Sequence, residues 1–396
     1  MIAENFKCPD AGRVVKTHTG YSAFIPAPLP PKLEYDNGLV LLLSQADTAL
    51  SELAGVGRLL PNPHLLISPL ARREAVLSSR IEGTRATLSD VLLDEAAAPR
   101  GESRETDLLE VRNYIMAMEY GTARLAELPL SLRLVCELHA KLMDGVRGNH
   151  ATPGEFRRSQ NWIGPAGSSP ESAPYVPPPP EELMACLGQW ELFLHERDHM
   201  PVLIQCALMH EQFEAIHPFL DGNGRIGRLL ITLFLMERGR MRQPLLYLSD
   251  FIEAHRQDYY DLLQRVRTHG DWNAWLRFFL TGVAEIARDA SRRATRLLEL
   301  REQYRVQFAG KANVGTVLDQ LFVNPFITAA MAAETLKSST PTASRTLGIL
   351  ETAGVLREIS GRKWGRTWLA GTILDVIQET PTCPILFNPA PVIPGR

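Results

Sequence analysis

A single segment between two apolar helical patterns constrains this chain more than any other feature. It reads His217-Pro218-Phe219-Leu220-Asp221-Gly222-Asn223-Gly224-Arg225-Ile226-Gly227-Arg228, and apolar residues recur at helical spacing over about 201–216 before it and 225–238 after it. Gly222 and Gly224 permit tight or left-handed backbone, so successive amide groups can converge at the start of the second helix. Because N–H groups at a helix start attract anions, the segment predicts two helices joined by an anion-binding loop.

The charged residues of this loop indicate what kind of anion it binds. Arg225 and Arg228 are three residues apart, which places both guanidinium groups on one face of the helix, where they can hold phosphate oxygens in paired hydrogen bonds. Asp221 offers a carboxylate oxygen, the ligand type that Mg²⁺ accepts together with phosphate and water. The loop therefore predicts a site for a nucleoside triphosphate with magnesium.

His217 is the group in this loop whose ordinary pKa lets it accept a proton near neutral pH. A lone histidine at a helix end is more often a cap or a packed core residue, and two arginines on a helix face are usually solvated. The joint occurrence of a base, a metal ligand, an anion loop and two phosphate-binding side chains favours an active site. We expect His217 to activate an incoming hydroxyl.

Composition and charge limit the class of protein. With 396 residues, 45% of them hydrophobic and 22% charged, the chain is long enough for two or three packed units. A net charge of -3 gives no general attraction to nucleic acid or anionic membrane. The cysteines are scattered without paired or metal-ligand spacing, no leader pattern opens the chain, and no apolar run approaches roughly 18 residues. We expect a cytoplasmic location and no membrane partner.

Helical periodicity extends over most of the chain, which predicts a mainly α fold. Residues 24–31 hold four prolines and predict an extended arm laid on the body, and a second helix is expected to start after Ser68-Pro69 and to end near Gly83. Further helical patterns cover about 39–52, 104–126, 131–144, 181–196, 201–216, 225–238, 255–268 and 272–309.

Two regions depart from this pattern. Residues 150–180 combine Gln160-Asn161-Trp162-Ile163-Gly164 with a loop rich in glycine, serine and proline, which predicts a small hairpin or flap. Helical patterns at 314–323, 328–336 and 340–353 precede strands at 355–359 and 367–370, which predicts a winged helix. With seven Lys or Arg against four Asp or Glu over 311–372, including Arg345, Arg362, Lys363 and Arg366, DNA binding and protein contact both stay open.

The signature segment resembles that of the Fic family, which has a His, a Phe two residues later, an Asp or Glu, Gly-Asn-Gly-Arg and a final Arg. The flap, the proline-rich arm, Tyr259-Tyr260 and Asp271-Trp272 are also similar to family features, so the resemblance covers roughly residues 20–290. It implies an N-terminal arm and inhibitory helix region (1–100) and a helical Fic core (101–290). The sequence pattern beyond them predicts a helical connector (291–312), a winged helix (313–380) and a tail (381–396).

The resemblance also implies an activity, the transfer of AMP from ATP to a Ser, Thr or Tyr hydroxyl of a target protein. His217 would deprotonate the hydroxyl and Asp221 would hold Mg²⁺. The backbone of Gly222, Asn223 and Gly224 would cradle the phosphates with help from Arg225 and Gly227, and Arg228 would hold the γ-phosphate. The flap at 154–176 would bind an extended target segment as an added strand. Ile163, Gly164, Tyr259 and Tyr260 are further expected nucleotide contacts.

A second motif predicts regulation. Ser78, Glu82 and Gly83 resemble the inhibitory motif of the same family, a Ser or Thr four residues before a Glu that is followed by Gly or Asn. In that family the Glu pairs with the last arginine of the signature, here Arg228, and competes with the γ-phosphate. On its own, a Ser and a Glu at helical spacing are usually part of a solvated face. Beside the complete signature, the motif predicts autoinhibition by Glu82.

Other readings stay open. Fic-like scaffolds also transfer other phosphate-containing groups or remove AMP, although relatives that phosphorylate proteins depart from the Gly-Asn-Gly-Arg pattern kept here. A DNA-binding regulator that only senses ATP is a non-enzymatic alternative, and the intact His217 argues against it. Trp272 and Trp275 are expected in the core, and His210 with Cys206 is weak evidence for a metal site. The resemblance also leaves a homodimer open.

Overall fold

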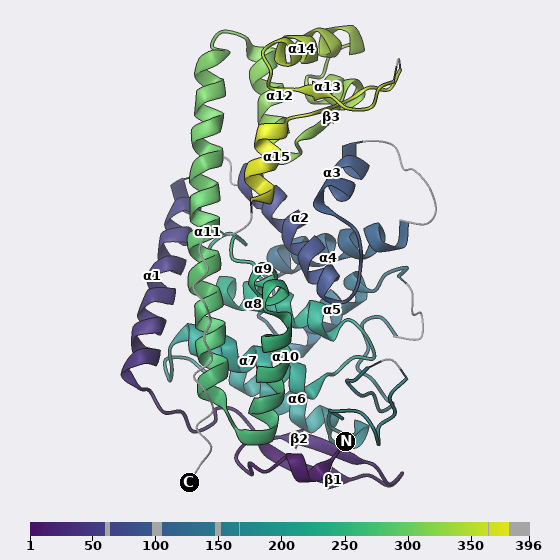
Figure 1. The fold of residues 1–396 in the computed structure, drawn as a ribbon, viewed down its shortest axis with the longest axis vertical. Helices are drawn as coiled ribbons and strands as arrows, with labels where there is room; N and C mark the ends of the chain where they lie inside the picture. The colour runs from purple at the N-terminus through teal and green to yellow at the C-terminus, as the bar shows by residue number, and fades with distance from the viewer. Residues whose placement is uncertain (60–63, 97–104, 147–151, 166, 363, 380–396) are drawn as a thin grey trace.

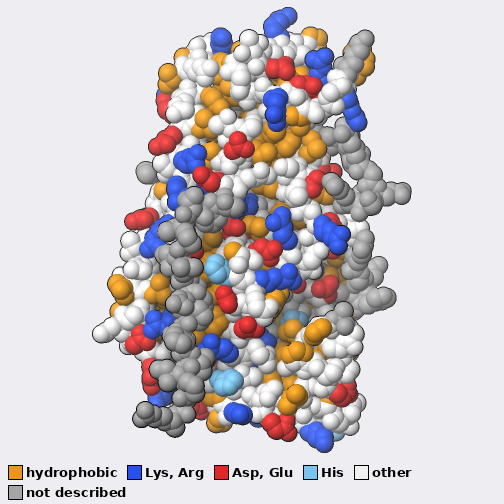
Figure 2. Space-filling model, in the orientation of Figure 1, with side chains coloured by type: hydrophobic (Ala, Val, Ile, Leu, Met, Phe, Trp, Pro, Cys, Tyr) orange, Lys and Arg blue, Asp and Glu red, His pale blue; other side chains and the backbone are white. Residues whose placement is uncertain are grey.

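The computed structural model describes residues 1–59, 64–96, 105–146, 152–165, 167–362 and 364–379. It is mainly helical and elongated, and one long helix, α11 (Trp272–Gln307), runs along most of its length (Figure 1). The lower part of the molecule holds the body, and the upper part holds the C-terminal helices. In the space-filling view of Figure 2, acidic and basic side chains are interspersed over the face shown, in keeping with the small net charge.

The body is a helical assembly around one large hydrophobic core. Helices α7 and α8 lie at its centre and are buried on nearly all sides, because the sequence places apolar residues all around them. The long helix α11 packs against α1 on one side. The body helices are α1 (Asn37–Leu59), α2 (His64–Ile81), α4 (Glu105–Arg124), α5 (Leu132–Leu142), α6 (Pro180–His195), α7 (Val202–Ile216), α8 (Asn223–Glu237), α9 (Ser249–Ala254) and α10 (Arg256–His269).

Helix α2 starts earlier than the sequence predicted. The prediction began it after Ser68-Pro69, whereas the structure begins it at His64 and keeps Pro69 inside the helix. A proline removes one backbone donor, and so near to the helix start it interrupts few intrahelical bonds. The other end is close to the prediction, since α2 ends at Ile81 and Gly83 adopts a φ of 106°.

Helix α1 has the length and hydropathy of a membrane span over Asn37–Arg58, although the sequence was expected to hold no such run. Its Leu39, Leu50 and Leu53 side chains are completely buried in the core shared with α11. Core helices of globular proteins have the same composition, so the finding carries no membrane assignment.

The proline-rich arm forms more structure than an extended segment. A short 3-10 turn, η1 (Ala3–Asn5), precedes strands β1 (Gly12–Lys16) and β2 (Ser22–Pro26), which pair as an antiparallel hairpin. The prolines of the arm permit this pairing because the first of them, Pro26, stands at the last position of β2. The amide of Phe24 also bonds the carbonyl of Val176 at 2.8 Å, which ties the hairpin to the flap. Within the flap, the described residues form a single antiparallel bridge between Ile163 and Tyr175.

The C-terminal region forms its own hydrophobic cluster. Its elements are α12 (Ala312–Val323), β3 (Phe326–Thr328), α13 (Ala329–Thr335), α14 (Thr340–Thr352), β4 (Arg357–Glu358), β5 (Thr367–Leu369) and α15 (Gly371–Gln378), and the antiparallel sheet has the order β3-β5-β4. Three helices and a strand pair occur in the predicted order, but the short strand β3 was not predicted. Lys363 of the expected wing and the tail at 381–396 lie outside the described residues.

This C-terminal cluster also includes a helix from the N-terminal region. Leu88 and Leu92 of α3 (Leu88–Ala96) are buried with Leu297 of α11 and the helices that follow it. The side-chain amide of Asn324 donates to the backbone carbonyl of Leu92 at 2.9 Å. The N-terminal region therefore contributes to the core of the body through α1 and α2 and to the C-terminal cluster through α3.

Candidate active site

The loop between α7 and α8 holds His217 in an unusual backbone conformation. His217 caps α7 with φ 50° and ψ 62°, the left-handed region that non-glycine residues seldom occupy, and its amide bonds the carbonyl of Phe213 at 2.9 Å. Such a conformation costs on the order of 1–3 kcal/mol and persists only where the surroundings impose it. The side chain consequently leaves the helix direction and lines a pocket.

The rest of the loop is braced by its own side chains. Asn223 accepts from the amide of Phe219 and donates to its carbonyl, both at 2.8 Å, so it holds the loop closed with its side chain and not by pointing at a ligand. Gly222 adopts φ 78° at the start of α8, and a side chain there would crowd Met143. The glycine and the asparagine thus fix the turn that begins α8.

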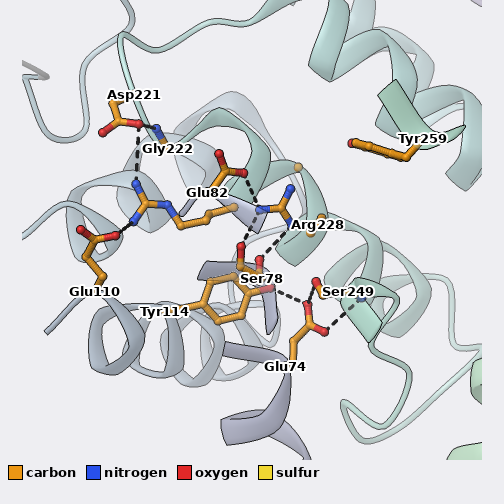
Figure 3. A network of polar contacts seen from close by, with 12 residues as sticks. Glu74, Ser78, Glu82, Glu110, Tyr114, Asp221, Gly222, Arg228, Ser249 and Tyr259 are labelled. Carbon is orange, nitrogen blue, oxygen red and sulfur yellow. Dashed lines mark hydrogen bonds and ion pairs between the residues drawn. The ribbon is translucent and has the colours of Figure 1, made fainter. Parts of the chain in front are cut away.

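Arg228 is buried and held by the inhibitory motif predicted from the sequence. Its Nη2 lies 2.6 Å from Oε1 of Glu82, and its Nε and Nη2 donate to the hydroxyl and carbonyl of Ser78, each at 2.9 Å (Figure 3). The predicted pair between Glu82 and Arg228 is therefore present in the structure. Gly83, which follows Glu82, ends the helix with its positive φ.

Helix α2 is fixed in register by a third residue on the same face. Glu74 lies one turn before Ser78 and accepts from the hydroxyls of Tyr114 and Ser249 at 3.0 and 2.6 Å (Figure 3). Because residues four apart share a helix face, Glu74, Ser78 and Glu82 form one polar line along α2. The hydrogen bonds of buried Glu74 therefore help to hold the helix in the position from which Glu82 reaches Arg228.

The carboxylate of Glu82 lies against the first turn of α8. A Cβ built on Gly224 would stand 2.4 Å from Oε1 of Glu82, so only glycine leaves room for this approach. Burial alone would raise the pKa of Glu82, but the charge and hydrogen bond of Arg228, with Arg225 and His217, lower it. An anionic carboxylate therefore occupies the place where the helix start would attract a phosphate.

Arg225 faces a different partner. Its Nη1 lies 2.8 Å from Oε2 of Glu110 on α4 and its Nη2 lies 3.6 Å from Oδ1 of Asp221, and the guanidinium is buried (Figure 3). The sequence predicted that Arg225 and Arg228 share one ligand-facing side. In this structure the two guanidinium groups have different carboxylate partners, Glu110 of α4 for Arg225 and Glu82 for Arg228, so their joint binding of one ligand stays a prediction.

Asp221 has the properties that a magnesium ligand requires. Its side chain is 57% exposed, and one carboxylate oxygen accepts from the amide of Gly222 at 2.6 Å. The exposed carboxylate beside the helix start is a hard oxygen donor next to an anion site, which suits Mg²⁺ bound jointly with phosphate. The residues present thus fit the metal that the sequence predicted.

A pocket of about 570 Å³ joins these residues, within the size range of small-molecule sites. Eight of the predicted site residues line it, namely Glu82, Ile163, Gly164, His217, Gly224, Arg228, Tyr259 and Tyr260. The other predicted site residues are not among those that line it, namely Ser78, Gly83, Asp221, Gly222, Asn223, Arg225 and Gly227. The flap, α2 and the α7–α8 loop therefore converge on one cavity, although they are far apart in the chain.

The two tyrosines of α10 differ in their surroundings. Tyr259 is buried, and its hydroxyl lies 3.0 Å from Nε2 of His210, whose Nδ1 lies 3.0 Å from the carbonyl of Gly227. Tyr260 is 39% exposed on the pocket wall, so it is the better placed of the two to contact a ligand. Both ring nitrogens of His210 already have protein partners, and Trp272 and Trp275 are buried as expected.

The electrostatics around His217 keep its imidazole neutral. Burial lowers the pKa of His217 to about 3, and the positive charges of Arg157 and Arg267 act in the same direction, whereas Glu82 raises it. At neutral pH the ring is therefore unprotonated. Its Nδ1 is buried without a hydrogen-bond partner among the described residues. A neutral imidazole at the pocket is the form that can accept a proton from a substrate.

Glu214 is a buried pocket residue that the sequence did not single out. Its Oε1 has no hydrogen-bond partner among the described residues, and burial raises the pKa of its carboxyl to about 7. Glu211 on the same helix has a similarly raised pKa but pairs with Arg267 at 3.3 Å. One turn of α7 thus places a weakly acidic carboxyl directly before His217.

We expect Glu214→Gln to stabilise the protein more at pH 8 than at pH 5. Because the folded-state pKa of Glu214 lies above the unfolded value, its contribution to the free energy of unfolding is fully present below about pH 4.5. This contribution falls as the pH rises through 7, by about 3 kcal/mol for a shift of this size. A glutamine side chain does not titrate, so its contribution does not change with pH. Thermal unfolding at both pH values measures the effect, and a difference in Tm between variant and parent that does not grow with pH would contradict it.

Several residues of the site escaped sequence reasoning because their partners are distant in the chain. Glu110 pairs with Arg225, and His139 stacks on Phe219 while its Nε2 lies 3.0 Å from the carbonyl of Asp221. Arg157 and Asn161 reach the loop from the flap. Of these residues, only Asn161 carried a local signal, since it belongs to the flap motif Gln160–Gly164.

Comparison with known proteins agrees with this geometry. Residues 40–123 match the Fic/DOC family N-terminal model, and residues 129–235 match the Fic/DOC family model. The chain is 31% identical over 206 residues to the protein adenylyltransferase Fic of Drosophila grimshawi, and 32% identical over 208 residues to that of Aedes aegypti. These matches cover 50% of this chain but only 38% and 37% of the relatives.

Solved structures show the same fold at lower identity. A Fic family protein from Desulfovibrio desulfuricans G20 gives a TM-score of 0.56 at 20% identity, over 86% of this chain and 98% of that one. A Fic domain containing signalling protein from Bacteroides thetaiotaomicron gives 0.50 at 18% identity, over 66% of this chain and 97% of that one. The chain therefore carries the N-terminal and Fic domains of the Fic/DOC family over residues 40–123 and 129–235, in a fold that it shares with solved Fic proteins.

Proposed function

We propose that this protein transfers AMP from ATP to a hydroxyl of a target protein. The observation that carries the proposal is the convergence of neutral His217, the helix start at Gly224 and buried Arg228 on one pocket of suitable size. The relatives named protein adenylyltransferase support it, although the chain spans well under half of their length. ATP is then the substrate, and Asp221 is the residue proposed to hold Mg²⁺.

In this proposal each residue has a separate task. The imidazole of His217 takes the proton of a Ser, Thr or Tyr hydroxyl, the oxygen attacks the α-phosphorus, and pyrophosphate leaves. The amides at the start of α8 and the guanidinium of Arg228 bind the phosphates. Arg225 orients Asp221 from its pair with Glu110. Magnesium at Asp221 would neutralise negative charge on the phosphates.

The proposed brake follows from the same contacts. Glu82 holds Arg228 at 2.6 Å and lies against Gly224, so a γ-phosphate would have to displace a carboxylate from both positions. Two anions cannot share one guanidinium without strong repulsion. The parent protein is therefore expected to bind ATP in an unproductive pose or weakly.

Ser78→Ala is expected to relieve this brake only partly. The change removes the hydrogen bond from Nε of Arg228 to the Ser78 hydroxyl, but the bonds to the Ser78 carbonyl and to Glu82 remain. Loss of one hydrogen bond of about 1 kcal/mol corresponds to a rise in transfer rate of roughly fivefold. Initial rates of label transfer measure it, and a rise as large as that of Glu82→Gly would contradict the central role given to Glu82.

Incubation with ATP labelled at either the α- or the γ-phosphate tests the proposed reaction. Transfer of AMP places the α label on protein and leaves the γ label in pyrophosphate. Protein carrying the γ label would indicate phosphate transfer instead, the alternative that the fold also permits. Loss of label from a pre-modified protein, without ATP, would point to AMP removal.

The remaining partners follow from the flap and the C-terminal region. We propose that a target segment docks along 154–176 beside the exposed Trp162, that the protein works in the cytoplasm, and that it forms a homodimer. Arg345 is exposed on α14, and Arg362 and Arg366 are exposed in the β4–β5 connection, which also holds the 83% exposed Trp364. A DNA-binding regulator remains the alternative function, and full-chain binding to duplex DNA that depends on these arginines would favour it.

A further inference from the structure

Arg157, a buried arginine of the flap, holds the backbone on both sides of His217. Its Nε donates to the carbonyl of His217 at 2.9 Å, and its Nη2 lies 3.4 Å from the carbonyl of Ile216. Its own amide donates to the carbonyl of Pro218 at 2.9 Å. Three consecutive carbonyls around the strained turn are therefore bonded to this one residue.

The same guanidinium is also fixed within the flap. Nη2 of Arg157 donates to the carbonyl of Pro178 at 2.5 Å and Nη1 donates to that of Ser159 at 3.3 Å, so the side chain links both ends of the flap. Asn161 adds a second link, since its amide donates to the carbonyl of Phe219 at 2.7 Å. The flap and the loop of His217 are thus joined as one unit.

We propose that Arg157 is a positioning residue that sets the place of His217 relative to a target docked on the flap. The inference rests on the proposed function. Arg157 is only 3% exposed and has no carboxylate partner among the contacts of the described residues, which is unusual for a buried arginine. Its donors are committed to backbone carbonyls, which indicates a geometric task and not a salt bridge. The Arg157 side chain would then fix the position of a target strand on the flap relative to the imidazole of His217.

The left-handed turn explains why such a residue is needed. His217 has no glycine-like freedom at φ 50°, so other groups must supply the free energy that keeps it there. A planar guanidinium with five donors can satisfy several carbonyls at once, whereas the single ammonium group of lysine cannot match this geometry. Arg157→Lys therefore tests geometry with the charge retained.

The pKa of His217 is a second readout, because a role of Arg157 in packing alone would leave that pKa unchanged. The charged groups that line the pocket with His217 are Glu82 just after α2, Glu214 of α7, Arg228 of α8, and Asp261 and Arg267 of α10, and Arg157 of the flap acts on His217 from outside the lining. Burial first, then Arg157 and Arg267, lower the pKa of His217. Burial lowers the pKa of Arg157 only to about 10, so the side chain stays charged at neutral pH. Removing that charge should raise the pKa of His217.

The experiment compares Arg157→Gln, Arg157→Lys and the matched control Arg133→Gln, each added to Glu82→Gly. Arg133 lies on α5 outside the flap, its side chain is 70% exposed, and it pairs with Glu137 on the same helix. A misplaced reacting group slows a reaction on the order of 10²-fold. We expect transfer to slow by about that factor in both Arg157 variants, with ATP affinity kept, while Arg133→Gln keeps the rate of Glu82→Gly.

Titration of the His217 ring by NMR provides an arm that does not need activity. The signal is assigned by its absence in His217→Ala, and it is followed in the full chain with and without Arg157→Gln. An upward shift of the pKa of His217 in Arg157→Gln, absent in Arg157→Lys and Arg133→Gln, supports the proposal even if no label is transferred by any form. An unchanged titration in Arg157→Gln, or a slowing equal to that of Arg133→Gln, would overturn it.

Discussion

Replacing Glu82 by glycine is expected to raise the rate of AMP transfer by about 10- to 100-fold. The change removes the charged hydrogen bond of 2.6 Å to Arg228, and bonds of this kind contribute roughly 1.5–3 kcal/mol. It also clears the carboxylate from Gly224, where a phosphate would approach the helix start. Initial rates of α-label incorporation with saturating ATP measure the effect.

Two further variants separate removal of the brake from a disturbed helix end. Glu82→Gln keeps the size of the side chain but loses its charge, so its rate should lie between those of the parent and Glu82→Gly. Arg80→Gly places the same flexible residue at an exposed position of α2 and should leave the rate unchanged. Equal rates in the parent and Glu82→Gly would remove the inhibitory role assigned to Glu82.

Replacing His217 by alanine in the Glu82→Gly background is expected to slow transfer by about 10²- to 10⁴-fold, the usual contribution of a general base. The imidazole is neutral at pH 7 because burial and nearby arginines lower its pKa, so the wild-type base is fully available. The phosphate-binding groups, Gly224 and Arg228, are untouched. ATP binding measured by calorimetry should therefore stay within a few-fold of the Glu82→Gly value.

The acidic side of the rate profile gives an internal check on this assignment. A base with a lowered pKa stays active to lower pH than an ordinary histidine would, so rates should hold through pH 6. Bound triphosphate is negative and should move the apparent pKa of His217 upward from its free-enzyme value. A variant lacking His217 that kept the parental rate would assign the base to another group, and Glu214 would be examined next.

Features whose residues are contiguous in the sequence could be predicted more fully than features formed by distant residues. The α7–loop–α8 arrangement could be predicted because its glycines, helix patterns and charged residues are contiguous. The pair between Glu82 and Arg228 spans 146 residues, and only the resemblance to a family pointed to it. The structure contains this ion pair, and its inhibitory effect on AMP transfer remains a prediction.

Features that depend on distant partners were missed or misjudged. The pair of Arg225 with Glu110, which lies 115 residues away, was not predicted, and phosphate binding by Arg225 stays a prediction. The role of the Asn223 side chain in closing the loop on Phe219 was also missed, while phosphate binding by its backbone stays a prediction. Helix α2 continues through Pro69 because a proline near a helix start disrupts few bonds. In each case a tertiary contact or a position along the helix decided between local options that the sequence left open.

Modification of protein by α-labelled ATP, compared among the parent, Glu82→Gly and the double variant Glu82→Gly with His217→Ala, tests AMP transfer most directly. All three are incubated with Mg²⁺ under identical conditions, and folding is checked by thermal unfolding. We predict little label on the parent, strong label on Glu82→Gly, and almost none on the double variant. Absence of label from every form that binds ATP, or equal label with and without His217, would contradict the assignment of this protein as an adenylyltransferase that uses His217.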